Sequence, residues 1–462
     1  MEAAKSLWLT RFAAPGTLAA ARLRPAPETM ENAMIDFDNN ATTPLDPEVF
    51  EVMEPWLKGA GNPSSGHARG RKAREAVEDA RQEIADLLGS DRREVVFTSG
   101  GTEANNLAIK GTLRAGKLKG RHIIRSAIEH PCVREPYSQL EQEGFEVTVA
   151  PVDEFGEVHA EALKELIRPD TVMISVMHAN NEIGTVNNLQ EIAEMIGYKR
   201  IMLHSDAAQS VGKLPTSFPL LGPNLMSLAA HKFHGPKGVG ALIVNRGVEL
   251  RPLNAGGGHE SGRRSGTLNV AGIVGMAKAL RLAWGSRLAE QGETITALRD
   301  YVHLRLAEEL RGVKLNGHPK YRLPSTLNLS FEGIKGKDLM TRLDELGVCV
   351  STASACQSGA AAPSAVLMAL GHSVGRALSS IRISFARTNT VEEADAAVEA
   401  MVKSVKELRA AESVDEASLA ESDRPQCPRT GEPLTVMSTS GGLLMQGGGG
   451  HLLPLPGTRP PE

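Results

Sequence analysis

The stretch Ala229-Ala230-His231-Lys232-Phe233-His234-Gly235-Pro236-Lys237-Gly238 contains Lys232, the residue that most restricts the interpretation of this chain. An apolar, strand-like run (224–230) precedes the lysine, and a Gly/Pro loop follows it. Lysine is almost never fully buried unless it is paired, so this position suits core packing poorly. It suits an amine that points into a cleft at the end of a strand. Asp206 closes an earlier apolar run (201–206) in the same way.

Around these two residues, short apolar strands alternate with amphipathic helical segments from about residue 35 to 285. This alternation predicts an α/β fold with a mainly parallel sheet covered by helices, in which ligands bind at the carboxyl ends of strands. We therefore expect a large domain at 34–290. A long helix at 288–310 is expected to lead into a smaller α+β domain at 291–411. The charged, then Gly/Ser-rich and Pro-rich residues 412–462 are predicted to form a disordered tail.

The first 33 residues differ in composition from the rest, being rich in Ala, Arg and Pro and poor in acids. Three interpretations remain open: a mitochondrial or plastid transit peptide, a start assigned too early, or a plain disordered extension. Met30 and Met34 are the alternative starts. A secretory signal is disfavoured because Arg11 and Pro15 interrupt the apolar stretch.

The composition restricts the class of protein. The 462 residues are 41% hydrophobic and 23% charged, with a net charge of -4, so no general attraction to nucleic acid or anionic membrane is expected. No apolar run is long enough to span a bilayer. The four cysteines, Cys132, Cys349, Cys356 and Cys427, lack zinc-ligand spacing, so no resident metal is predicted. A reducing compartment, by default the cytoplasm, is expected.

The segment Thr98-Ser99-Gly100-Gly101-Thr102-Glu103-Ala104-Asn105-Asn106 joins a strand to a helix through two glycines. Glycines permit a tight turn, and the free N–H groups of a helix N-terminus attract phosphate. Gly101 and Thr102 are therefore candidate phosphate ligands. An ordinary capped turn is the alternative, because two glycines before a helix are a weak signal.

Four polar residues follow other strand-like runs. His130 could stack on an aromatic ring and carry protons, or be an ordinary histidine. Asn181 could donate to a phenolic oxygen, although Asn180-Asn181 also favours a turn. Asp206 could hold a ring nitrogen protonated, with Gln209 reaching a ring oxygen, whereas the alternative for Asp206 is a helix N-cap.

Three later segments complete the candidate site. The loop 256–267, rich in Gly, Arg and Ser, suits an anion or is simply solvated. Small residues flank Cys356, which predicts an exposed, mobile loop and a reactive rather than structural thiol. Arg382 lies in a strand-like run, where it could pair with an acid or fork onto a substrate carboxylate.

A lysine that can form a Schiff base, together with an acid for a pyridinium nitrogen, is the minimal apparatus of a pyridoxal 5'-phosphate enzyme. With the opening Phe37-Asp38-Asn39-Asn40-Ala41-Thr42-Thr43-Pro44, these motifs resemble the cysteine desulfurases of the class V aminotransferase superfamily from about residue 35 to 410. The context of Cys356, Ser354-Ala355-Cys356-Gln357-Ser358-Gly359, resembles the long-loop, sulfur-mobilising branch. This resemblance implies a fold-type I transferase.

The resemblance also implies a role for each candidate residue. Cys356 would attack the sulfur of L-cysteine and become a persulfide, leaving L-alanine, and Arg382 would hold the substrate carboxylate. Thr267 would reach the phosphate of a partner subunit, which implies a homodimer. The cofactor contacts would be Lys232 as the Schiff-base lysine, His130 on the ring, Asp206 at the ring nitrogen, Gln209 and Asn181 near the ring oxygen, and Thr102 and His231 at the phosphate beside Gly101.

Two residues depart from the family pattern, and several readings stay open. Ala229 stands where many relatives have a phosphate-binding serine, and His259 replaces the usual glutamine. The leading hypothesis is a desulfurase that supplies sulfur to acceptor or scaffold proteins for iron–sulfur clusters and thio-cofactors, with Cys356 a possible transient cluster ligand. A selenocysteine lyase, another class V aminotransferase or lyase, and a non-enzymatic scaffold are the alternatives. The unfamiliar residues 412–462 count against a direct mitochondrial orthologue.

Overall fold

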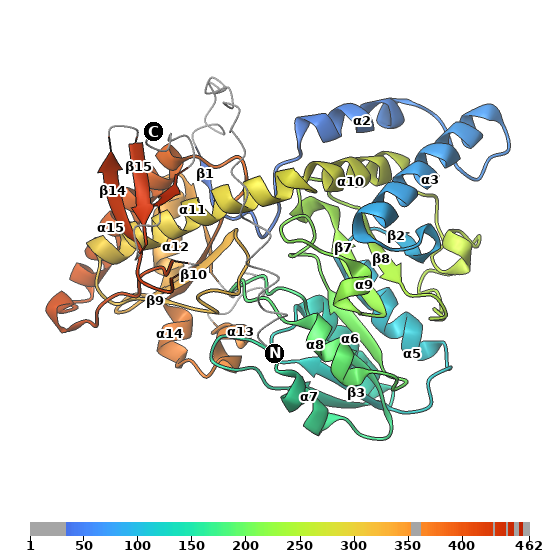
Figure 1. Ribbon diagram of the computed structural model, residues 1–462, viewed down its shortest axis with the longest axis horizontal. Coiled ribbons are helices and arrows are strands. Elements are labelled where there is room, and N and C mark those ends of the chain that lie inside the picture. Colours follow the sequence, from blue (N-terminus) through green and yellow to red (C-terminus); the bar gives the residue numbers. More distant parts are fainter. Residues whose placement is uncertain (1–33, 353–361, 428–429, 440–441, 448–451, 456–462) are drawn as a thin grey trace.

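The computed structural model describes residues 34–352, 362–427, 430–439, 442–447 and 452–455. Within these ranges, a large domain with a seven-stranded sheet lies beside a smaller domain with a four-stranded sheet (Figure 1). The long helix α11 (Ser286–Glu309) runs between the two domains, close to the helix predicted at 288–310. The mixed α/β architecture confirms the predicted fold class.

The large sheet is mainly parallel, because β8 is the one strand of the seven that runs against its neighbours. Successive side chains of β8 enter different cores: Ala241 and Ile243 face one side, and Leu242 and Val244 the other. Both faces are buried, so the strands are continuous apolar runs. In spatial order the strands are β2 (Val95–Thr98), β8 (Gly240–Val244), β7 (Leu225–Ala229), β6 (Met202–Asp206), β5 (Thr171–Ser175), β3 (His122–Ser126) and β4 (Glu146–Ala150).

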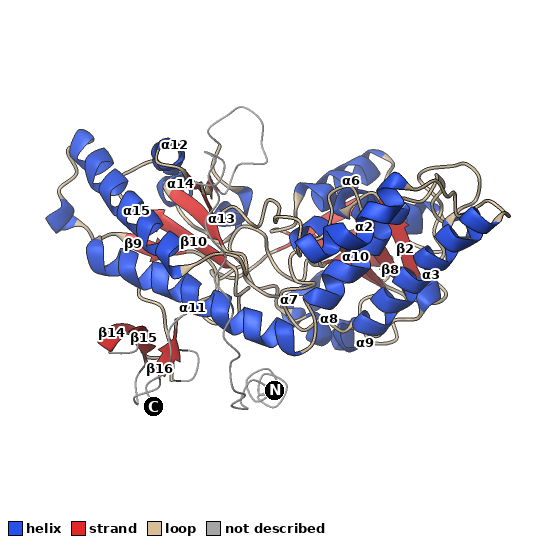
Figure 2. Cartoon of the chain, turned by 90° about the horizontal axis from the view of Figure 1, so that it is seen from above, coloured by secondary structure: helices blue, strands red, loops and turns tan. Residues whose placement is uncertain are grey.

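Helices cover both faces of this sheet (Figure 2). Local sequence sets their starts: Asn188 caps α8 by accepting the N–H of Glu191, and Pro131 occupies the first turn of α6 after the cap His130. The helices are α2 (Pro47–Lys58), α3 (Ala68–Leu88), α4 (Gly101–Asn106), which continues through a π-helical turn into α5 (Thr112–Arg114), α6 (Pro131–Gln142), α7 (Ala160–Leu166), α8 (Leu189–Ile196), α9 (Phe218–Leu221) and α10 (Val270–Leu282).

The smaller domain has an antiparallel sheet with long helices packed against it. Its longest helix starts with a capping box, in which Thr390 and Glu393 satisfy each other's backbone N–H groups. The elements are β9 (Val313–Leu315), β10 (Thr326–Phe331), α12 (Gly336–Glu345), β11 (Val348–Cys349), β12 (Ser351–Thr352), α13 (Ala365–Ala369), α14 (Val374–Leu378), β13 (Ser380–Ser384) and α15 (Val391–Ala411).

The first described residues belong to the smaller domain, which corrects the boundary predicted at residue 34. Strand β1 (Ile35–Asp36) pairs in parallel with β11, and Phe37 is fully buried in the core of the smaller domain. The chain then crosses into the large domain. The prediction missed this arrangement because a two-residue strand gives no periodic signal, and its partner lies some 300 residues away along the chain.

The prediction of a disordered tail from residue 412 is wrong for the part of the tail that the structure describes. Residues 419–423 run along the edge strand β9, where Gly312 donates to the carbonyl of Ala420 and Asp423 donates to that of Val313. Cys427 and Leu434 are buried against the smaller domain. Three further strands, β14 (Thr435–Thr439), β15 (Gly442–Gln446) and β16 (Leu452–Pro454), form a sheet beside α11 (Figure 2). An unpaired strand edge and a few apolar residues thus order a segment whose composition is mostly polar.

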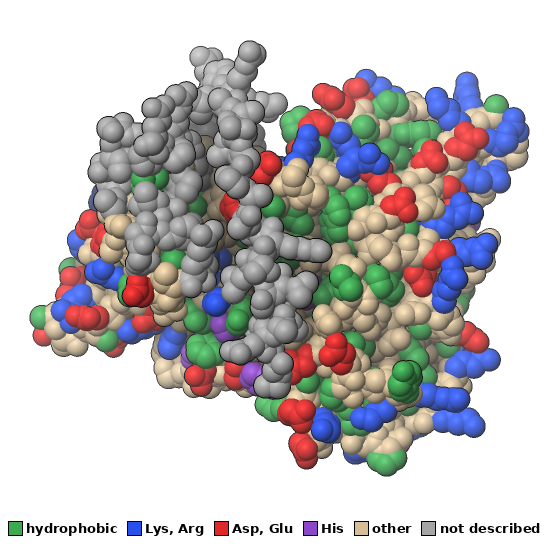
Figure 3. All heavy atoms as spheres, in the orientation of Figure 1, with side chains coloured by type: hydrophobic (Ala, Val, Ile, Leu, Met, Phe, Trp, Pro, Cys, Tyr) green, Lys and Arg blue, Asp and Glu red, His purple; other side chains and the backbone are tan. Residues whose placement is uncertain are grey.

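Two predictions fall outside the described residues: the extension 1–33, and Cys356 with its neighbours at 353–361. Among the helices that are described, none is long and apolar enough to cross a membrane. On the face drawn in Figure 3, acidic and basic side chains are interspersed over the large domain.

Candidate active site

Five of the predicted motifs meet at one edge of the large sheet. Lys232 ends a short turn that follows β7, and Asp206 is the last residue of β6. His130, Asn181 and Gly101 follow the parallel strands β3, β5 and β2. Carboxyl ends of parallel strands lie at the same edge of a sheet, so the chain order of the motifs becomes a spatial cluster.

The amine of Lys232 points at the opening segment of the chain. Its Nζ donates to the carbonyl oxygens of Asn40, at 2.7 Å, and Ala41, at 2.8 Å. The side-chain amide of Gln209 donates to the same Asn40 carbonyl at 2.9 Å. The structure therefore brings Lys232 and Gln209 together, as predicted, on a backbone group that the sequence did not single out.

A second lysine, Lys213, lies at the same place. Its Nζ donates to Oδ1 of Asn40 at 3.1 Å and to Oε1 of Gln209 at 2.8 Å. Burial, together with the positive charges of Lys232 and Arg382, lowers the pKa of Lys213 to about 7. Lys213 and Lys232 also border a cavity of about 30 Å³ between the two domains. The site thus contains a second amine that can be neutral near physiological pH.

Asp206 is 6% exposed and is held by two N–H donors. Its Oδ1 accepts the backbone N–H of Ala208 at 3.0 Å, and its Oδ2 accepts the side-chain amide of Asn105 at 2.7 Å. These bonds close a turn at the end of β6 and do not cap a helix. The arrangement leaves a fixed carboxylate at the floor of the site, as an acid that pairs with a ring nitrogen requires.

His130 lies close to both charged residues. It caps α6 by accepting the N–H of Cys132 at 3.1 Å. Burial lowers the pKa of His130, the negative charge of Asp206 raises it, and the positive charge of Lys232 lowers it again. An imidazole that caps a helix and has a lowered pKa can lie against a ring and exchange protons, and the role of His130 in cofactor binding stays a prediction.

The predicted phosphate end has the tight backbone that the glycines suggested. Gly100 adopts φ 150°, ψ -178°, which is accessible essentially only to glycine. A Cβ built on Gly101 would lie 3.4 Å from the Cβ of Ala229, so the position of the missing serine faces the helix start. His231 lies 3.2 Å from the hydroxyl of Thr42, and burial with neighbouring lysines lowers its pKa to about 4.

Thr102 and Thr267 are both exposed. Arg264, three residues before Thr267, forms an ion pair of 2.8 Å with Glu103 at the start of α4. The loop 256–267 is therefore anchored beside the helix N-terminus rather than simply solvated. Within the described chain, no hydrogen bond joins the Thr267 side chain to the other site residues, and its role across subunits stays a prediction.

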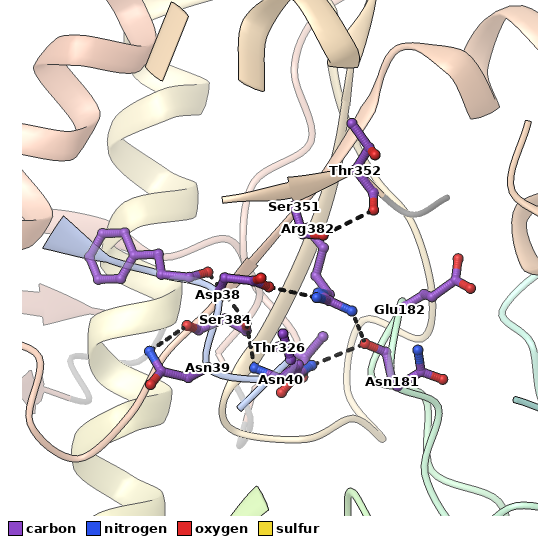
Figure 4. Close-up of polar contacts among 12 residues, drawn as sticks. Asp38, Asn39, Asn40, Asn181, Glu182, Thr326, Ser351, Thr352, Arg382 and Ser384 are labelled. Atoms are coloured by element: carbon purple, nitrogen blue, oxygen red, sulfur yellow. Dashed lines mark hydrogen bonds and ion pairs between the residues drawn. The ribbon is translucent and has the colours of Figure 1, made fainter. Parts of the chain in front are cut away.

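Arg382 on β13 lines the other wall of the site (Figure 4). Its Nη2 is 2.6 Å from Oδ1 of Asp38, and its Nη1 donates to the carbonyl of Asn181 at 3.1 Å. Its Nε is buried without a hydrogen-bond partner among the described residues. The expected acid pair is present, and one buried N–H remains for a further acceptor. The amide of Asn40 donates to the same Asn181 carbonyl at 3.1 Å, which links this wall to Lys232.

Strand β12 brings the chain towards Cys356 next to this arginine. Ser351 pairs with Arg382 across the sheet, and Thr352 is the last described residue before the gap that contains Cys356. The description resumes at residue 362, and Ser364 donates to the carboxylate of Glu182 at 2.5 Å. Both ends of the cysteine segment therefore lie beside the site, one at Arg382 and one at the loop that carries Asn181.

The donor set fits the cofactor expected from the sequence, pyridoxal 5'-phosphate. Lys232 offers the amine, Asp206 the carboxylate for a ring nitrogen, and His130 a flat partner for the ring. Gly101 and its helix start, with Thr102 and His231, offer N–H and hydroxyl donors for a phosphate.

Sequence reasoning missed four residues that organise this site: Asp38, Asn40, Asn105 and Lys213. The first three lie inside quoted motifs, but polar residues in turns are too common to be assigned a role from sequence. Lys213 had a usable signal, because it follows Gln209 by four residues, and such spacing brings side chains together where the backbone turns helically.

Known proteins resemble this chain over most of its length. The aminotransferase class-V family model matches residues 35–397. A cysteine desulfurase IscS from Dictyoglomus turgidum is 45% identical over 373 residues, which are 80% of this chain and 94% of that protein. The solved structure of a NifS-like protein is 38% identical with a TM-score of 0.76, covering 81% of this chain and 100% of its own. A structure of SspA in complex with cysteine is 37% identical with a TM-score of 0.67, covering 76% and 98%. The chain belongs to the aminotransferase class-V family and, within it, to the cysteine desulfurases.

Proposed function

We propose that this protein is a pyridoxal-phosphate-dependent cysteine desulfurase, which converts L-cysteine to L-alanine and takes the sulfur onto Cys356 as a persulfide. The observation that carries the proposal is the placement of Lys232, Asp206 and Arg382 in one site. Asn40 and Asn181 link Lys232 to Arg382, and the charges of Asp206 and Lys232 both act on His130. The strand that leads to Cys356 is paired to the strand of Arg382. A cationic anchor, an amine and a ring-nitrogen acid are the groups that amino-acid chemistry on this cofactor requires.

When bound, pyridoxal phosphate withdraws electrons from the α- and β-carbons of an amino acid. The carboxylate of Asp206 would pair with the ring nitrogen and stabilise a positive charge there. Lys232 holds the cofactor through its amine and moves protons at the substrate carbons. His130 would lie against the ring, and Gln209 and Asn181 would lie near its oxygen. Gly101, Thr102 and His231 would hold the phosphate.

The substrate we propose is L-cysteine. Arg382 has a buried Nε available to a carboxylate, and a related structure contains cysteine. An arginine in this position fixes the orientation of the amino acid, because its fork matches a carboxylate. Selenocysteine has the same carboxylate and amine, so a comparison of turnover with the two substrates decides between desulfurase and selenocysteine lyase.

The sulfur-transfer step follows from the chemistry of thiols. The thiolate of Cys356 attacks the sulfur of the substrate, and an S–S bond forms as the C–S bond breaks. The electron pair of the C–S bond passes to carbon, which takes up a proton, so alanine leaves and Cys356 keeps the extra sulfur. Acceptor or iron–sulfur scaffold proteins then take this sulfur. We propose that the enzyme acts in a reducing compartment, the cytoplasm.

We propose that the enzyme acts as a homodimer. Phe50 and Leu57 on α2, with Leu45 just before the helix, are exposed large hydrophobic residues, as expected of a surface that a second copy covers. Thr267 on its anchored loop would then reach the phosphate of the other subunit. Sedimentation of the cofactor-loaded protein tests this proposal, since a monomer would leave Thr267 without its partner site.

The substitution Cys356→Ser tests the proposed reaction, with Cys349→Ser as the matched control. We expect Cys356→Ser to retain the cofactor absorbance and to bind cysteine, yet to form no persulfide, whereas Cys349→Ser forms it normally. Mass spectrometry of peptides from the wild-type enzyme locates the extra sulfur. Sulfur found on Cys132, Cys349 or Cys427 would assign the nucleophile to that residue instead.

A further inference from the structure

We propose that Asn105 and His204 are positioning residues that orient the carboxylate of Asp206 towards the ring nitrogen. The inference rests on the proposed function, in which Asp206 pairs with the ring nitrogen of the cofactor. It concerns a buried chain of side chains behind Asp206 that does not itself reach the cleft.

Asn105 is the centre of this chain. It is 0% exposed and lies four residues after Gly101 in α4, one turn behind the phosphate end. Its Nδ2 is 2.7 Å from Oδ2 of Asp206, and its Oδ1 is 3.0 Å from Nε2 of His204. The first turn of α4 therefore lies at the proposed phosphate end, and one turn later the amide of Asn105 contacts Asp206, the acid proposed to pair with the ring nitrogen.

The carboxylate of Asp206 fixes the direction of the hydrogen bonds on either side of Asn105. A carboxylate only accepts, so the amide nitrogen of Asn105 must face Asp206 and its oxygen must face His204. Nε2 of His204 then carries the proton, and its Nδ1 accepts from the hydroxyl of Ser175 at 2.9 Å. The hydroxyl of Tyr137, 2.8 Å from Ser175, connects the chain to the backbone carbonyl of Ile124.

His204 contributes a single N–H to this chain at physiological pH. It is 0% exposed, and burial lowers its pKa to about 4, although the charge of Asp206 acts in the opposite direction. The imidazole therefore stays neutral with a single N–H, which it donates to the side-chain oxygen of Asn105 as long as that oxygen faces it. If Asn105 turned over, His204 would have to carry its proton on Nδ1 instead, and Asp206 would face a carbonyl oxygen.

Asp206 needs this support because of where it lies. A buried carboxylate needs hydrogen-bond donors in place of the water that burial removes. The N–H of Ala208 donates to Oδ1 of Asp206, and the amide of Asn105 donates to Oδ2. The thiol of Cys132 lies 3.7 Å from the same Oδ2. Cys132 is a poor substitute for Asn105, because burial raises the pKa of this thiol and it is only a weak donor.

The test compares two ligands, pyridoxal phosphate and its 1-deaza analogue, in which carbon replaces the ring nitrogen. The dissociation constants of both are measured on the apoprotein for the wild type, Asn105→Leu and His204→Phe. The matched control is His122→Phe, because His122 is a fully buried histidine of the same sheet, 2.6 Å and 2.8 Å from the hydroxyls of Thr171 and Thr148 and remote from Asp206.

We expect Asn105→Leu to raise the dissociation constant of pyridoxal phosphate about tenfold or more. The dissociation constant of the deaza analogue should change less than about twofold. His204→Phe should show the same selective loss to a smaller extent, and His122→Phe should show none. Equal losses for both ligands in Asn105→Leu and His204→Phe, or no loss for either, would mean that the chain is merely structural. If the wild type itself binds both ligands equally well, Asp206 does not pair with the ring nitrogen, and the proposed cofactor arrangement fails along with the inference.

Discussion

Arg382 and Asp38 form an ion pair across the active site, with Nη2 of the arginine 2.6 Å from Oδ1 of the acid. The two residues are 344 positions apart in the chain, and the pair joins the opening segment to strand β13 (Figure 4). It fixes the guanidinium plane and leaves the buried Nε without a partner among the described residues. A substrate carboxylate would therefore meet an arginine that is already oriented.

This geometry predicts the effect of Arg382→Lys. A lysine cannot contact Asp38, the carbonyl of Asn181 and a substrate carboxylate with a planar fork, so KM for cysteine should rise about tenfold or more with a smaller change in kcat. Steady-state kinetics measures both constants. The control is Arg305→Lys, which alters another arginine–aspartate pair, with Asp395, away from the site. Unchanged KM in Arg382→Lys would remove Arg382 from substrate binding.

The two lysines that meet at Asn40 should behave differently. Lys232→Ala should abolish the near-visible absorbance of the bound cofactor, whereas Lys213→Met should retain it, because the amine of Lys213 is hydrogen-bonded to the side chains of Asn40 and Gln209. Absorbance spectra of the reconstituted variants provide the comparison. If Lys213→Met loses the band and Lys232→Ala keeps it, the two assignments must be exchanged.

Lys213 should also make stability depend on pH. Its pKa is lowered from 10.5 to about 7 by burial and by the charges of Lys232 and Arg382, so between these values the folded protein binds fewer protons than the unfolded chain. The free energy of unfolding must then rise with pH across this window. Below about pH 7 the buried lysine is charged, and its destabilising effect is complete. We expect the urea midpoint of the wild type, relative to that of Lys213→Met, to increase between pH 7 and 9.5. A constant difference over that range would place the pKa of Lys213 near its ordinary value.

The C-terminal segment should contribute to the stability of the smaller domain. Truncation after residue 411 removes the bonds from 419–423 to β9 and exposes the side chains that Cys427 and Leu434 cover. The thermal midpoint should fall by several degrees, and the smaller domain should become sensitive to protease. Asp423→Asn, which keeps the segment but weakens its contacts with Lys314 and the N–H of Leu315, should have a smaller effect. An unchanged midpoint after truncation would show that the segment adds nothing to this core.

The placement of Lys232, Asp206 and His130 could be predicted from the sequence, because strand ends of a parallel sheet share one edge. The pairing of β1 with β11 could not, since it depends on contacts between distant short segments. Asn105 and Lys213 lay near predicted residues, but their roles depend on which atom faces which partner. The order in residues 412–427 was missed for a related reason: its cause is the open edge of β9, not the composition of the segment.

The measurement that tests the central claim most directly is the release of sulfide from L-cysteine by purified, cofactor-loaded protein with a reductant, with alanine quantified in the same tube. We predict equal amounts of sulfide and alanine, and neither product from Lys232→Ala. Protein that is yellow and dimeric but forms no sulfide and no alanine from cysteine would contradict the assignment of this substrate.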